Sequence, residues 1–203
     1  MSKQQFDREK FKDVVHYIVA QARPEELGRV KLHKTLYFAD MMWFIAKGVA
    51  LTGAEYRKQP MGPCASHLTW ALNALETEGR VRQSREWYFG YEKHRFTSVG
   101  PAPLGRLDRE ALILLDDTID FVCRNNTAQT ISELSHTRAW ESIDMGDVMP
   151  YHSAINILPN EIDADTMAWG AEETARIAAT RSGETPLQRR SYREFRESLR
   201  GDR

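Results

Sequence analysis

The residues of this chain that could do chemistry are six histidines, two cysteines and several carboxylates. Cys64-x-x-His67 supplies two ligands, whereas a structural zinc site needs four and a catalytic one three. Ser135 and His136 are adjacent, and adjacent helical side chains point about 100° apart, which gives no triad geometry. Neither a Gly-x-Ser-x-Gly elbow nor a phosphate-binding glycine loop is present in the sequence. We therefore expect no catalytic residue, no metal and no cofactor.

Nucleic-acid binding is a second chemistry to weigh, because basic and aromatic residues alternate over residues 80–97. Basic side chains on a ribbon can grip a phosphate backbone while aromatic rings stack on bases. Alternatively, the aromatic residues face a core and the charges face water, and the residue types favour this alternative. Beyond Thr180, seven arginines stand against four acids, a net charge of +3. Arg189, Arg190 and Arg193 in this tail could contact RNA or an acidic protein equally well.

Charged residues interrupt an otherwise apolar segment at Lys31, Lys34 and Asp40. A buried charge is costly unless it is paired, so two interpretations remain. In one, the charges form an internal network: a lysine pairs with an acid, and Asp40 accepts a hydrogen bond from Tyr56 or from an amide near Gly62. In the other, this polar edge and the loop after it form a recognition surface. Residue types alone favour the internal network.

The elements that must position these residues are mostly helices. Apolar periodicity predicts helices over residues 7–22, 29–47, 64–78, 109–125, 130–143 and 163–178, and a two-stranded ribbon over residues 80–99. Pro63 fits the first turn of the third helix, and Asp108 is expected to cap the fourth. Thr130-x-x-Glu133 reads as a capping box that opens the fifth helix. The second helix is apolar on nearly all sides and is the expected central element.

The predicted fold class is mainly α with a small β element. A compact helical domain over residues 1–179 would carry the wing-like ribbon near 80–99, and a basic tail over residues 180–203 would order only on a partner. A chain of 203 residues can bury a core without disulfides or metals, and its net charge of -1 argues against a large nucleic-acid-binding field. Two cysteines, no apolar signal core and no long apolar run favour a cytoplasmic protein without membrane contact.

Several short motifs follow one another in a fixed order. They are Lys31-Leu32-x-Lys34-x-x-Tyr37-x-x-Asp40, Tyr56 with Gly62-Pro63, Leu75-x-x-x-Gly79, and Leu134-Ser135-His136 with Trp140 and Tyr151. Their order and spacing, over about residues 10–155, resemble the SocA-like Panacea domain, an antitoxin family with phage-associated members. Thr35 departs from the leucine that is usual in the first motif.

The resemblance implies an antitoxin of a bacterial or phage toxin–antitoxin module, which neutralises a cognate protein toxin by direct contact. One family member resembles an adaptor that delivers its toxin to an AAA+ protease, so that role is an alternative. A winged-helix-like nucleic-acid regulator is another alternative, and self-association is left open. The family supplies no catalytic residue, and the ribbon and the tail are the expected determinants of partner choice. The candidate partner-binding residues are Lys31, Lys34, Tyr37, Asp40, Tyr56, Gly62, Pro63, Arg189, Arg190 and Arg193, and a structural network is expected of His136, Trp140 and Tyr151.

Overall fold

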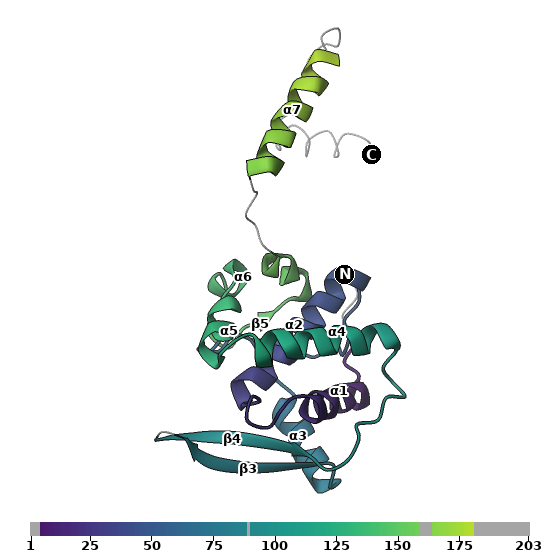
Figure 1. Cartoon of the computed structure of the whole chain (residues 1–203), viewed down its shortest axis with the longest axis vertical. Helices are drawn as coiled ribbons and strands as arrows, with labels where there is room; N and C mark the ends of the chain where they lie inside the picture. The colour runs from purple at the N-terminus through teal and green to yellow at the C-terminus, as the bar shows by residue number, and fades with distance from the viewer. Residues whose placement is uncertain (1–4, 89, 159–163, 181–203) are drawn as a thin grey trace, which may run out of the picture. The chain divides into compact units, whose positions relative to one another are not determined.

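The computed structural model describes residues 5–88, 90–158 and 164–180 of the chain (Figure 1). By its internal contacts the chain divides into two compact units, residues 1–159 and residues 160–203. Helices dominate, and the strands form two small antiparallel sheets, which confirms the predicted fold class. Within the described ranges, no helix is long and apolar enough to cross a membrane.

The helices of the first unit follow the predicted order. They are α1 (Arg8–Gln21), α2 (Arg29–Lys47), α3 (Leu68–Thr77), α4 (Arg109–Ile119) with the π-helical turn η1 (Asp120–Arg124), α5 (Ala128–Leu134), α6 (Arg138–Glu141) and the 3-10 helix η2 (Tyr151–Ile157). In the second unit, α7 spans Ala164–Thr180. The Asp108 carboxylate accepts a hydrogen bond from the Ala111 amide at 2.8 Å and caps α4 as expected.

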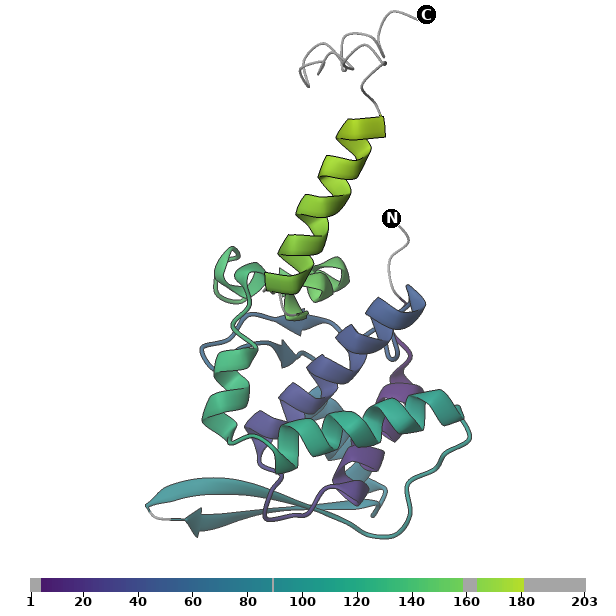
Figure 2. The same cartoon turned by 45° about the horizontal axis from the view of Figure 1, so that its top comes forward.

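Helix α2 is the central element of the first unit. It packs against α1, α4, η1, α5 and η2 and against two of the strands. Both views show α4 lying across it (Figure 1, Figure 2). Its end is set by Gly48, whose φ of 73° is the left-handed conformation that glycine adopts at little cost. Helix α2 is apolar on nearly all sides because it is buried on most of them.

The ribbon consists of β3 (Val81–Tyr88) and β4 (Tyr91–Ser98), paired antiparallel. At its base Val81 and Phe96 are buried against the helices, whereas Trp87 near its tip is 79% exposed. Figures 1 and 2 show the tip end reaching beyond the helices. The expectation that the aromatic residues of the ribbon face the core therefore holds at its base, at Phe96. It does not hold for Trp87.

A second sheet, which the sequence analysis missed, joins three two-residue strands in the order β2-β1-β5. They are β1 (Tyr56–Arg57), β2 (Cys64–Ala65) and β5 (Val148–Met149). The predicted start of the third helix at residue 64 is therefore wrong, and Pro63 precedes a strand instead of opening a helix. Strand pairing with β1 and a hydrogen bond from the Ala65 amide to His33 Nδ1 (3.1 Å) occupy this segment.

The predicted fifth helix, 130–143, is also wrong, because it is divided into α5 and α6. The capping box is formed by Thr127 and Thr130, one turn before the predicted pair. The Thr137 side chain then accepts from the Trp140 amide and starts α6 as a separate helix. A hydroxyl that caps a new helix competes with continuation of the old one, which explains the break.

Candidate functional site

The carboxylate of Asp40 is the centre of a buried polar network. The side chain is 1% exposed, and it accepts hydrogen bonds from the Thr52 amide (2.8 Å), the Thr52 hydroxyl (2.5 Å) and the Tyr56 hydroxyl (2.7 Å). Burial raises the pKa of Asp40, and the hydrogen bonds from Thr52 and Tyr56 partly offset that rise. The network ties α2 to the loop and strand that follow it.

Tyr56 and Tyr151 extend this network to the backbone. The Tyr56 hydroxyl also lies 2.8 Å from the carbonyl oxygen of Leu36, so its single proton has two acceptors. Tyr151 donates to the Ala54 carbonyl at 2.9 Å, and its ring packs edge-on against Tyr56 with centroids 6.2 Å apart. If Asp40 holds a proton, it can donate to Tyr56 while Tyr56 donates to Leu36, which satisfies every group.

Lys34, Gly62 and Ser135 meet where the loop before β2 crosses α2. Lys34 is 1% exposed, and its Nζ donates to the Pro63 carbonyl at 3.2 Å. Gly62 has a φ of 90°, and a Cβ on it would lie 2.2 Å from Ser135 Oγ and 2.3 Å from Lys34 Nζ. The ammonium and the hydroxyl thus occupy the place of a side chain, which is why this position requires glycine.

His136 and Trp140 form a stacked pair beside this junction. Their ring centroids are 3.8 Å apart at an interplanar angle of 11°, and the Lys58 ammonium lies 4.3 Å from the centre of the Trp140 ring. His136 Nε2 and Trp140 Nε1 are both buried without a hydrogen-bond partner among the described residues. The pair therefore fixes the turn after α5 against α6 by ring contact and not by a hydrogen bond.

One expectation about the lysines is wrong. Lys31 Nζ donates to the Cys123 carbonyl at 2.8 Å and Lys34 Nζ to the Pro63 carbonyl, so carbonyl oxygens stand where an acid was expected. The Tyr56 hydrogen bond proposed for Asp40 is present. Thr35, which departs from the family pattern, is buried, and its hydroxyl donates to the Lys31 carbonyl at 2.9 Å.

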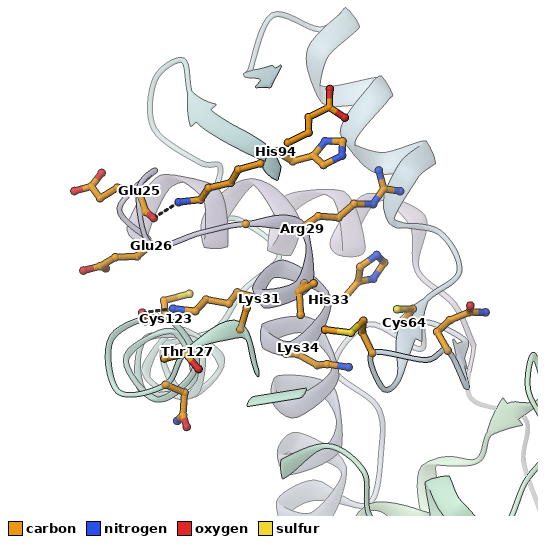
Figure 3. A pocket seen from close by; sticks show the side chains of 18 of the residues that line it. Glu25, Glu26, Arg29, Lys31, His33, Lys34, Cys64, His94, Cys123 and Thr127 are labelled. Carbon is orange, nitrogen blue, oxygen red and sulfur yellow. Dashed lines mark hydrogen bonds between the residues drawn. The ribbon is translucent and has the colours of Figure 1, made fainter. Parts of the chain in front are cut away.

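A groove of about 1100 Å³, here called the α2 groove, opens beside the first turns of α2 (Figure 3). Its walls come from the α1–α2 loop, α2, the loop before β2, strand β4 and the chain after η1. Lys31 and Lys34 line it, and so do Arg29 and His33, which the sequence analysis did not select. Their spacing of four residues indicates a shared helix face, but not the groove that they line.

The other sequence-selected residues lie elsewhere. Tyr37, Asp40, Tyr56, Gly62 and Pro63 are buried, so they support the groove and its flanking strands from inside. The arginines of the tail, Arg189, Arg190 and Arg193, lie outside the described residues. Within those residues, no three His, Cys, Asp or Glu side chains gather as a metal-binding group.

The charge of Lys34 should make stability depend on pH. Burial lowers the pKa of Lys34 from 10.5 to about 8. Between these values the unfolded chain binds more protons than the native one, so the free energy of unfolding should rise with pH, by up to about 3 kcal/mol. Urea denaturation at about pH 7.5 and pH 9.5 should show about 2 kcal/mol of this gain in the parent chain and none of it in Lys34→Met. Lys10→Met, at a half-exposed position of α1, should keep the gain, and equal gains in all three chains would contradict the assignment to Lys34.

These observations define a mainly helical domain with a buried signature, by which we mean Lys34, Asp40, Tyr56 and Gly62. The signature fixes the segment after α2 against that helix, and the α2 groove lies open beside it. The family model of the antitoxin SocA-like, Panacea domain matches residues 32–141, more than half of the chain. The chain therefore belongs to this family, which confirms the resemblance seen in the sequence motifs. No curated protein and no solved structure matches the chain.

Proposed function

We propose that this chain is an antitoxin that neutralises a cognate protein toxin by binding it directly. The observation that carries the proposal is membership of the SocA-like antitoxin family, through a match that includes the residues of the buried signature. Because those residues are buried, the toxin would contact exposed surfaces instead. The candidates are the α2 groove and the exposed part of the ribbon.

The proposed role is binding without catalysis. Two charged groups of the family motifs are engaged internally: Asp40 accepts three hydrogen bonds, and Lys34 donates to a backbone carbonyl. Burial raises the pKa of the Cys64 thiol, which disfavours the thiolate that a nucleophile needs. These features support a structural role for the polar residues, which stabilise the domain and do not react with a substrate.

The charges of the ribbon favour a protein partner over a nucleic acid. Arg85 forms an ion pair with Glu92 at 3.1 Å, and Arg95 pairs with Glu86 at 3.0 Å. With four basic residues against two acidic ones over residues 81–98, these pairs leave a net charge of +2, which attracts a phosphate backbone weakly. An exposed tryptophan flanked by paired charges is instead the composition of a protein–protein contact.

Co-expression with the product of the adjacent open reading frame tests the proposal. Growth restored in cells that express that product, together with a stoichiometric complex on affinity purification of this chain, would support neutralisation by binding. Toxin loss that depends on an AAA+ protease would point to the adaptor alternative. The absence of both complex and rescue, with duplex affinity that falls steeply with salt, would replace the proposal by the nucleic-acid regulator.

Trp87→Ser should weaken the complex by about tenfold or more without changing stability. The ring is 79% exposed, so its loss removes little native packing but would remove a contact of the size that dominates interfaces. Calorimetry of the purified pair and thermal unfolding of the free chain measure the two effects. Ile113→Ser, at a 52% exposed position on α4, is the control and should leave affinity unchanged. Equal affinity of the Trp87 variant would remove the ribbon tip from the interface.

A further inference from the structure

One end of the α2 groove presents hydrogen-bond donors from α2, and the acidic residues Glu25 and Glu26 lie at its other end. We propose that this donor end, formed by Arg29 and His33 beside the buried charge of Lys34, receives a carboxylate side chain of the bound toxin. The inference rests on the proposed function, because it names the chemistry of the toxin segment that enters the groove. It assigns a recognition role to residues that neither the motifs nor the family match single out together.

His33 is fixed as a donor by the backbone. The Ala65 amide donates to His33 Nδ1 at 3.1 Å, so Nδ1 carries no proton. Burial, with the nearby charges of Arg29 and Lys34, lowers the pKa of His33 to about 3, which keeps the ring neutral. The remaining ring proton is therefore on Nε2, and His33 lines the groove. The imidazole offers one N–H to an occupant at any physiological pH.

Arg29 and Lys34 add positive charge beside that N–H. Arg29 lies one turn before His33 on the same face of α2, and it uses one nitrogen to donate to the Thr69 hydroxyl at 2.8 Å. A guanidinium has five N–H donors and no acceptor, so the group retains donors for a ligand. Lys34 follows His33 in the chain and lines the same groove. Its side chain is buried, so it contributes positive charge from beneath the groove surface.

The first turn of α2 reinforces this preference. The helix begins at Gly28, which has no side chain to cap the exposed amides, and its first turn contains no acidic residue. The partial positive charge at a helix start therefore adds to the charges of Arg29 and Lys34. It does not carry the assignment, which depends on the donor side chains and the groove.

The acidic residues of the groove explain why a single carboxylate fits better than a nucleic acid. Glu25 and Glu26 lie at the opposite end from Arg29 and His33 (Figure 3), and Glu92 is paired with Arg85. A phosphate backbone carries charge along its whole length and would meet these acids. One Asp or Glu side chain reaches only the donor end, where hydrogen bonds to charged donors are strong.

Peptide titration followed by ¹⁵N NMR tests the site without the toxin. The capped peptide Ac-Gly-Glu-Gly-NH₂ should shift the signals of His33 Nε2 and the Arg29 guanidinium to saturation, whereas Ac-Gly-Gln-Gly-NH₂ should not. Arg29→Gln should lose the response at His33, and Arg109→Gln, an exposed arginine on α4 outside the groove, should keep it. Equal response to both peptides, or none to either, would overturn the site. A response to inorganic phosphate or a short DNA duplex in place of the Glu peptide would also overturn it.

The same variants separate this inference from the proposed function. With the product of the adjacent reading frame, Arg29→Gln and Lys34→Met should weaken the complex by about tenfold, and Arg109→Gln should not. A complex that forms with the parent chain and is unchanged in Arg29→Gln and Lys34→Met overturns the carboxylate site and leaves the antitoxin role intact. Failure of the parent chain to bind counts against the antitoxin role, whatever the peptides show.

Discussion

Gly62→Ala should destabilise the first unit by about 2–5 kcal/mol. The left-handed φ of 90° costs a residue with a Cβ about 1–2 kcal/mol. The new methyl would also lie 2.2 Å from Ser135 Oγ and 2.3 Å from Lys34 Nζ, and both groups are buried and held by hydrogen bonds. Forcing an extra carbon into such packing costs about 1–3 kcal/mol more.

Gly146→Ala is the matched control for this prediction. Gly146 has the same φ of 90°, but a Cβ there would meet nothing within 4 Å. It should therefore cost only the backbone term, about 1–2 kcal/mol. Urea denaturation of the two variants isolates the contribution of the crowded junction. Equal losses would mean that Lys34 and Ser135 move aside freely and that glycine is required for its backbone alone.

Asp40→Leu should cost about 3–5 kcal/mol, whereas Asp40→Asn should cost far less. Leucine leaves the buried Thr52 amide without its acceptor and removes the partner of two hydroxyl groups. An asparagine oxygen can still accept from the Thr52 amide, and its NH₂ can donate to the Tyr56 oxygen while Tyr56 donates to Leu36. Denaturant titrations near neutral pH compare the two variants. A loss in Asp40→Asn as large as in Asp40→Leu would show that the charge itself is required.

Asp40→Asn should also remove a contribution to stability that falls as pH rises on the acid side. Burial raises the pKa of Asp40 above 3.8, so between 3.8 and the raised value the native chain binds more protons than the unfolded chain. The contribution of this group is fully present below pH 3.8 and is lost as pH rises through that window. Asp40→Asn removes the effect, so the difference in unfolding free energy between parent and variant should change across the window. Asp117→Asn, at an exposed position of α4, should leave the slope unchanged. A constant difference between parent and Asp40→Asn would contradict a raised pKa.

The sequence was most informative where local chemistry and burial agree. Helix α2 was predicted over residues 29–47, and Arg29–Lys47 is what the structure contains, because flanking glycines and a continuous apolar surface act together. The ribbon was found from its β-forming residues, although its register was not readable. The polar network around Asp40 was predicted in part, since hydrogen bonding from Tyr56 follows from the cost of a buried charge.

The errors came from segments whose structure depends on distant partners. Cys64–Ala65 forms a strand because β1 lies beside it, which no local pattern of residues 64–78 reveals. Lys34 and Lys31 satisfy carbonyl oxygens of other segments, and residue types alone suggested acids. Arg29 and His33 were overlooked because the α2 groove exists only once β4, η1 and the loop before β2 surround them.

The burial of the family motif has a consequence for engineering. Residues such as Tyr37, Asp40 and Gly62 are buried inside the scaffold, so the proposed partner would contact other positions. Randomising exposed ribbon positions such as Arg82 and Trp87 would sample new binding specificities on an unchanged frame. Directed evolution can therefore confine a library to the exposed ribbon positions, whereas Lys34 is needed for both the fold and the proposed carboxylate site.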